Sequence, residues 1–172
     1  MKKFGANGQK TLKIIHLILA GMWVGGSLGL ILMIACLGPA QSGGELYGYD
    51  LACKFVDDYL IIPGAMGCLL SGLLISLFTP WGFFKHRWVT VKWVLTVACI
   101  LFGTFYLGPM VNGRPLVSEA LGLEALRDPA YASAQSRNFF GGLFQFAAIL
   151  FMVAISTIKP WRKVKQKTGA DQ

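Results

Sequence analysis

Two histidines, His16 and His86, are the residues best suited to metal or haem chemistry, because a neutral imidazole nitrogen ligates iron and other metals. His16 is surrounded in sequence by isoleucine and leucine and has no obvious structural use. His86 stands between Lys85 and Arg87, so it is either a ligand or part of a basic cluster. With no carboxylate beside them the two histidines make a poor zinc site, and without a Cys-x-x-Cys-His motif no covalently attached haem is expected.

Lys92 and Gln145 are the other candidates, since each interrupts a long apolar stretch. An ionisable side chain is costly inside a membrane and is therefore a functional candidate there. Lys92 lies about one turn inside its stretch, at a depth similar to that of His16. It either contacts a ligand or extends its ammonium group to the lipid headgroups. No carboxylate is expected deep within a stretch, which disfavours a small proton-coupled antiporter.

Four apolar stretches position these residues: 12–37, 55–78, 88–110 and 139–158. Each is close to the ~20 residues that a helix needs to cross the ~30 Å hydrocarbon core. A soluble domain is disfavoured, because 55% of the residues are hydrophobic and only 14% are charged. The sequence predicts an all-α, integral membrane four-helix bundle that forms a single membrane domain over 1–172. We further expect a Gly-rich link over 39–52, a helical loop on the outer face over 116–127 and a disordered tail over 163–172.

The basic residues are distributed unevenly along the chain, whose net charge is +8. Twelve of the 16 lie near the two termini or around the connection between the second and third stretches, whereas seven of the eight acidic residues lie toward the opposite ends. The positive-inside rule therefore predicts that both termini are cytoplasmic in a multi-pass protein of the bacterial plasma (inner) membrane. Membrane lipid is the expected partner and nucleic acid is not, because the basic charge is explained by topology.

Small residues recur at every fourth position of two stretches, as Gly21, Gly25 and Gly29 in the first and as Gly64, Cys68, Gly72 and Ser76 in the second. Such spacing lets helix backbones approach closely. We favour packing within the chain, although the same faces also suit a homo-oligomer, a membrane partner subunit or a flat ligand. Cys36 and Cys53 both lie toward the outer face and either pair or remain free thiols.

The first stretch resembles the first helix of the HemJ-type membrane protoporphyrinogen oxidases, a group related to copper-resistance D-like proteins. The resemblance rests on the segment 12–18 with His16, on Ile62-Pro63-Gly64, and on Trp88 followed four residues later by Lys92, so it covers roughly residues 11–110. It implies a haem-associated helical membrane protein in which His16 and Lys92 are functionally important. The oxidases carry an arginine and a second histidine toward the end of the first helix. The segment 28–36 has neither, which favours haem binding over the oxidase reaction.

From these residues and this resemblance we expect haem b, or another porphyrin, to bind near the cytoplasmic side. His16 is the expected axial ligand and His86 the candidate second ligand. Four further residues complete the expected site, two cations for the propionates and two rings beside the macrocycle: Arg87, Lys92, Trp23 and Trp93. An enzyme of this kind is a haem-dependent oxidoreductase acting on a porphyrin or quinone. The alternatives are a HemJ-like protoporphyrinogen IX oxidase and a non-catalytic transport or assembly partner subunit.

The charge distribution predicts that tags at both termini are cytoplasmic and that residues 111–137 face outward. A cysteine introduced by Glu119→Cys, in a Cys36→Ser background, should react with an impermeant maleimide added to intact cells. Labelling of that cysteine only after the membrane is permeabilised would contradict the predicted topology.

Overall fold

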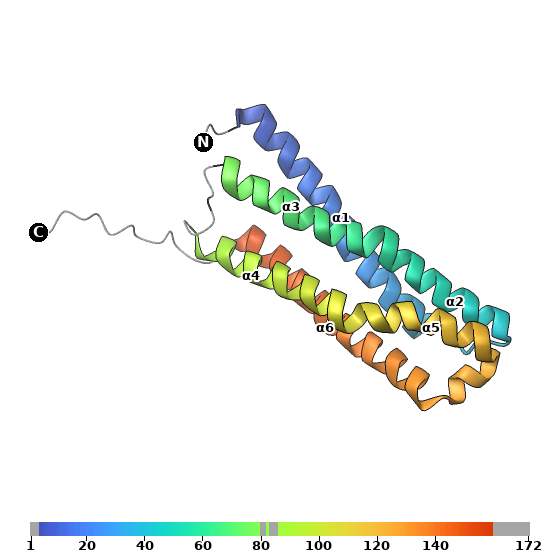
Figure 1. Ribbon diagram of the computed structural model, residues 1–172. Helices are drawn as coiled ribbons and strands as arrows, with labels where there is room; N and C mark the ends of the chain where they lie inside the picture. The colour runs from blue at the N-terminus through green and yellow to red at the C-terminus, as the bar shows by residue number, and fades with distance from the viewer. Residues whose placement is uncertain (1–3, 80–81, 83–85, 160–172) are drawn as a thin grey trace, which may run out of the picture.

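The computed structural model of the chain describes residues 4–79, 82 and 86–159, and every element of this part is helical (Figure 1). The elements join into four long helices, which are α1 (Ala6–Cys36); α2 (Gly43–Val56), η1 (Asp57–Ile61) and α3 (Ile62–Phe78); α4 (Arg87–Phe102), η2 (Gly103–Leu107), α5 (Gly108–Leu121) and η3 (Gly122–Arg127); and α6 (Pro129–Ile158). All four are long and apolar enough to cross a membrane. The predicted all-α fold, with four helices that could each span a membrane, is confirmed for the described residues.

Large apolar side chains cover the outside of the bundle. Phe105, Phe140 and Phe144 are 75%, 68% and 70% exposed, which is unusual for a water-soluble surface and suits contact with lipid. The interior is narrow and contains small or medium side chains around one buried indole. This core cluster consists of Trp23, Ala65, Cys68, Cys99, Ile149 and Met152.

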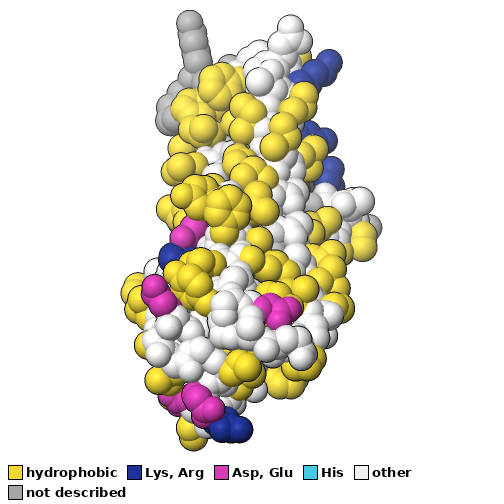
Figure 2. All heavy atoms as spheres, turned by 90° about the vertical axis from the view of Figure 1, so that its right-hand side faces the viewer, with side chains coloured by type: hydrophobic (Ala, Val, Ile, Leu, Met, Phe, Trp, Pro, Cys, Tyr) yellow, Lys and Arg dark blue, Asp and Glu magenta, His cyan; other side chains and the backbone are white. Residues whose placement is uncertain are grey.

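The two ends of the bundle differ in charge. At one end, which we call the basic end, α1 and α4 begin and α3 and α6 end (Figure 1). Its basic residues within the described part are Lys10, Lys13, Arg87, Lys92 and Lys159. The opposite, acidic end contains α2, α5 and the start of α6, and Figure 2 shows acidic side chains gathered over it. The acidic residues of this end within the described part are Glu45, Asp50, Asp57, Asp58, Glu119, Glu124 and Asp128.

The helices extend further at the acidic end than predicted. Residues 43–52 are helical, although a Gly-rich link was expected over 39–52. Ser42 and Glu45 explain this difference, because the Ser42 hydroxyl accepts a hydrogen bond from Glu45 N–H and Glu45 accepts one from Gln41 N–H. This reciprocal cap is a start signal that the sequence contained.

The expected outer loop is likewise not a separate element. Residues 116–127 continue the helix that begins at Arg87, and Gly122, at φ 55°, marks the change from α5 to a 3-10 turn. The fourth helix begins at Pro129 and not near 139, because Asp128 caps its first turn through Ala130 N–H and proline suits the first helical position. The expected tail, 163–172, lies outside the described residues.

Close contact between α1 and α3 depends on glycine. A Cβ added to Gly64 would lie 2.7 Å from the backbone nitrogen of Trp23, and one added to Gly26 would lie 3.0 Å from Leu60 and Ile61 side-chain atoms. The predicted packing of the second small-residue stripe is therefore confirmed at Gly64. For the first stripe it was wrong within this chain. A Cβ at Gly21, Gly25 or Gly29 would meet nothing within 4 Å, because this face of α1 points away from the other helices.

An ion pair is buried at the acidic end between α2, α5 and α6. Arg114 Nε lies 3.5 Å from Asp50 Oδ1, and the Tyr131 hydroxyl donates to Asp50 Oδ2 at 2.9 Å. All three side chains are 3% exposed. Arg114 Nε and Nη2 make no hydrogen bond in the described part of the chain. No sequence pattern indicated this cluster, since Asp50 and Tyr131 are 81 residues apart. All four cysteines are free, so Cys36 and Cys53 do not pair.

Gly64→Leu should lower the melting temperature (Tm) of the purified protein in detergent. The side chain would meet the backbone of α1, which cannot move aside locally, and overpacking of this kind costs about 1–3 kcal/mol. Gly25→Leu is the matched control, because it adds the same group to the open face of the same helix pair. Equal Tm losses in the two variants would mean that the Gly25 face is also packed, for instance against another subunit.

Arg114→Met should destabilise the protein by about 3–5 kcal/mol, because it leaves the Asp50 carboxylate buried without its partner. Replacing both partners, by Asp50→Leu together with Arg114→Met, should recover at least half of this loss. Denaturant or thermal unfolding in detergent measures both effects. Additive losses in the double variant would contradict a direct interaction between the two side chains.

Candidate functional site

His16 is held in one orientation by α3. Its Nδ1 lies 2.8 Å from the hydroxyl of Ser71, which is 4% exposed. The Ser71 hydroxyl donates its own hydrogen to the carbonyl of Gly67 at 2.5 Å, so it can only accept from the imidazole. In the neutral imidazole the proton is therefore on Nδ1, and Nε2 keeps its lone pair. In histidines that bind a metal, one ring nitrogen commonly ligates the metal and the other donates a hydrogen bond.

His16 lines a cavity of about 560 Å³ at the basic end, which is partly open to the outside. Its walls come from α1, α3, α4 and α6, and Figure 1 shows α1 and α3 diverging from α4 and α6 toward this end. The volume falls within the range of about 300–1,000 Å³ that is typical of cofactor and small-molecule sites. The cavity is therefore large enough for a ligand much bigger than a metal ion.

The charges around this cavity have one sign. Lys10 and Lys13 approach from α1, Lys92 from α4 and Lys159 from the end of α6. No acidic residue lines the cavity within the described part of the chain. The arrangement therefore favours an anionic ligand, since the lysine ammonium groups are strong hydrogen-bond donors to carboxylate or phosphate.

Two indoles line the cavity at the start of α4. Trp88 and Trp93 both border it, and Trp93 Nε1 donates to the Ser76 hydroxyl at 3.2 Å. Ser76 is itself buried on α3. This bond joins α4 to α3 across the cavity wall and fixes the ring of Trp93. The cavity thus combines flat apolar surface with a cationic rim, which suits an amphiphilic ligand.

Three of the six predicted site residues share this cavity, namely His16, Lys92 and Trp93. The other three do not line it. His86 precedes the first turn of α4, with its ring centroid 6.2 Å from that of Trp88, and Arg87 is exposed. Trp23 is 3% exposed and belongs to the core cluster, so it cannot flank a ligand here.

Sequence reasoning missed several residues of the cavity. Lys10, Lys13 and Lys159 were interpreted only as topology signals, and Ser71 was not singled out. Ser71 lies seven residues after Gly64 and therefore on the same helix face, which contacts α1. This spacing could have identified Ser71 as a neighbour of α1.

The donor atoms fit a haem better than an isolated metal ion. No group of three His, Cys, Asp or Glu side chains suited to a metal occurs among the described residues. A haem brings four nitrogen ligands of its own and needs only one or two from the protein. His16 Nε2 supplies one, and the lysines suit the two propionates. The structure offers no second imidazole in this cavity, because His86 does not line it.

Comparisons with protein families, curated proteins and solved structures found no match to this chain.

Proposed function

We propose that the protein is a multi-pass protein of a bacterial plasma membrane that binds haem b, or another porphyrin, in the cavity at the basic end. The observation that carries this proposal is the His16–Ser71 pair, whose hydrogen bond leaves Nε2 available inside a cavity of about 560 Å³. In this assignment both termini and the basic end face the cytoplasm, as the distribution of lysine and arginine indicates.

Each residue has a distinct role in the proposed site. His16 would be the one protein ligand to the iron, and Ser71 would hold its tautomer and ring orientation. Lys92 and Lys13 would bind the propionates. Trp93, fixed by Ser76, supplies flat apolar surface beside the ring. A bound haem b would supply one-electron redox chemistry, tuned by its axial ligand and its burial.

A HemJ-like porphyrinogen oxidase is the second candidate. One observation favours it: His16 and Lys92, which the resemblance implies to be functionally important, line the same cavity. The haem-binding function does not depend on this reaction. Oxygen consumption with protoporphyrinogen IX by the haem-loaded protein distinguishes the two candidates, because a haem-binding protein without the oxidase activity gives none above the free-haem background.

His16→Ala should abolish or sharply reduce the Soret absorption of the protein purified from haem-supplemented cells or reconstituted with haemin. The wild-type spectrum should be that of a haem with one protein ligand, because the cavity contains one imidazole. His86→Ala is the matched control, since it removes the only other histidine and should leave the spectrum unchanged.

Two further variants test the supporting roles. Ser71→Ala should weaken haem retention about 10- to 100-fold, as expected for loss of a hydrogen bond to a ligating histidine. Lys92→Ala should weaken it less, because it removes a propionate contact and not the ligand. A wild-type Soret band in His16→Ala would overturn the proposed function and favour a non-catalytic partner subunit.

A further inference from the structure

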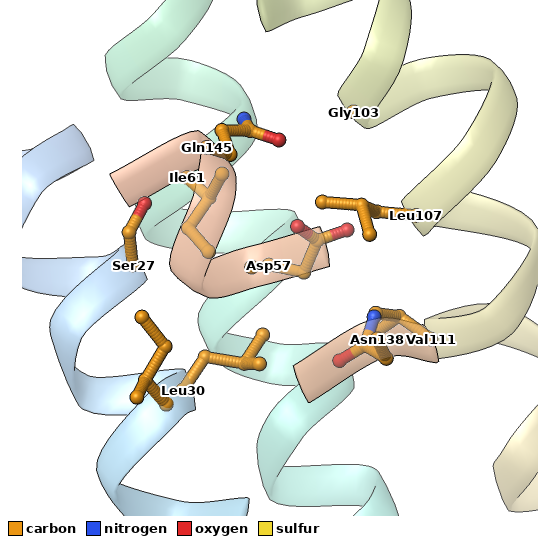
Figure 3. A pocket seen from close by; sticks show the side chains of 11 residues that line it. Ser27, Leu30, Asp57, Ile61, Gly103, Leu107, Val111, Asn138 and Gln145 are labelled. Atoms are coloured by element: carbon orange, nitrogen blue, oxygen red, sulfur yellow. The ribbon is translucent and has the colours of Figure 1, made fainter. Parts of the chain in front are cut away.

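A second, smaller cavity lies deeper in the bundle, toward the acidic end (Figure 3). Its volume is about 40 Å³, and its walls come from α1, η1, η2, α5 and α6. At roughly 10–15 Å³ for each water-sized occupant, it holds about three or four. It shares no residue with the cavity at the basic end. Four of its lining residues have side-chain oxygens, and they are Ser27, Asp57, Asn138 and Gln145.

Two amide oxygens in this cavity have no partner. Asn138 is 2% exposed and Gln145 is 6% exposed, and neither Asn138 Oδ1 nor Gln145 Oε1 accepts a hydrogen bond within the described chain. In Figure 3 the Asp57 carboxylate lies between these two amide groups. Buried polar atoms nearly always have a hydrogen-bond partner. Two amide oxygens without one, beside a carboxylate, therefore indicate a ligand that binds to oxygen lone pairs.

Asp57 also lacks an ion-pair partner of its own. Its neighbour Asp58 is paired with Lys54 at 2.6 Å, and Lys54 is further engaged by Asn112. Asp50 is paired with Arg114. No ion pair to Asp57 occurs in the described residues. The sequence placed Asp57 at the outer start of a span. In the structure Asp57 lines the same cavity as Gln145, which lies well inside the fourth stretch.

Two π-helical turns flank the cavity, and their ends line it. They are η1 (Asp57–Ile61) and η2 (Gly103–Leu107). Each is followed after one residue by a proline, Pro63 or Pro109. Proline has no N–H group, so the carbonyl four residues before it loses its helical partner. The preceding turn loosens to a bond across five residues, from Ile62 N–H to Asp57 and from Gly108 N–H to Gly103. Such turns are frequent at functional sites.

The chemistry of the donors identifies the class of ligand. Carboxylate, amide carbonyl and hydroxyl oxygens are hard donors that suit hard cations and not soft metals. A single carboxylate neutralises one positive charge, whereas a divalent ion would leave a net charge in a region of low dielectric. The volume of about 40 Å³ has room for one Na⁺ ion together with water. Water alone would satisfy the amides but would leave the carboxylate charge unbalanced.

We propose that this cavity is a Na⁺-binding site, in which Asp57 supplies the neutralising charge and Ser27, Asn138 and Gln145 supply neutral oxygen ligands. The site is independent of haem binding at the basic end. Binding of Na⁺ joins α1, η1 and α6 through one ion, so it should stabilise the folded bundle.

The test is the Tm of the purified protein in detergent, with NaCl exchanged for choline chloride at constant ionic strength. Raising Na⁺ to about 100 times its dissociation constant should increase Tm by about 5–10 °C, because a ligand that binds only the folded state stabilises it by mass action. Asp57→Asn should abolish this increase. Asp58→Asn is the matched control and should retain it, because Asp58 is paired with Lys54 and does not line the cavity.

Three outcomes would overturn the proposal. They are an equal Tm in Na⁺ and choline, an undiminished Na⁺ response in Asp57→Asn, and a Tm difference between wild type and Asp57→Asn that varies with pH but not with Na⁺. The last outcome would mean that the Asp57 carboxylate is protonated and does not bind Na⁺. A larger response to K⁺ would overturn the assignment to Na⁺. Binding of ²²Na⁺ to the wild-type protein, displaced by unlabelled Na⁺ and not by choline, tests the site without a variant, and no displaceable binding would overturn it.

Discussion

The close approach of α1 to α3 at Gly64 and Gly26 determines the geometry of both cavities. Because no Cβ intervenes at Gly64, the two backbones come near enough for His16 to reach Ser71 at one end of the contact. At the other end, the same approach brings Ser27 beside Ile61 and Asp57. In a lipid environment the hydrophobic effect contributes little to association between helices, so such backbone contact and interhelical hydrogen bonds determine how they pack. A larger residue at Gly64 would separate the helices that hold both sets of polar groups.

The two cavities differ in charge as well as in size. At the basic end, lysines from three helices surround a neutral imidazole with no acidic residue among the lining side chains, which favours an anionic amphiphile. In the core, one carboxylate and two amide oxygens surround a space of about 40 Å³, which favours a small cation. Since the core cluster around Trp23 and Ile149 lies within the same bundle, the two sites are parts of one packed unit and share the helices α1 and α6.

Specific polar contacts hold the helices together at the acidic end. The cap of α2 by Ser42 and the cap of α6 by Asp128 satisfy backbone groups where the helices end. The buried Asp50–Arg114 pair with Tyr131 joins three helices at this end. Removal of either charged partner would leave the other charge buried and unpaired, which is costly. The pair therefore holds α2, α5 and α6 together at this end of the bundle.

The sequence by itself determined the four apolar helices, because their lengths match a membrane and a spanning backbone must satisfy its hydrogen bonds within each helix. It also identified His16 and Lys92 as partners in one site, since both are ionisable and lie at similar depth on helices that begin or end together. It did not determine which face of α1 packs. The helix contains several glycines, and of Gly21, Gly25 and Gly26 only Gly26 lies against a neighbouring helix. Nor did it determine that Ser71 orients His16, or that Asp57 lines one cavity with Asn138 and Gln145. These residues are far apart in the chain. Helix rotation and register, which are properties of the tertiary structure, decide whether their side chains point toward each other or toward lipid.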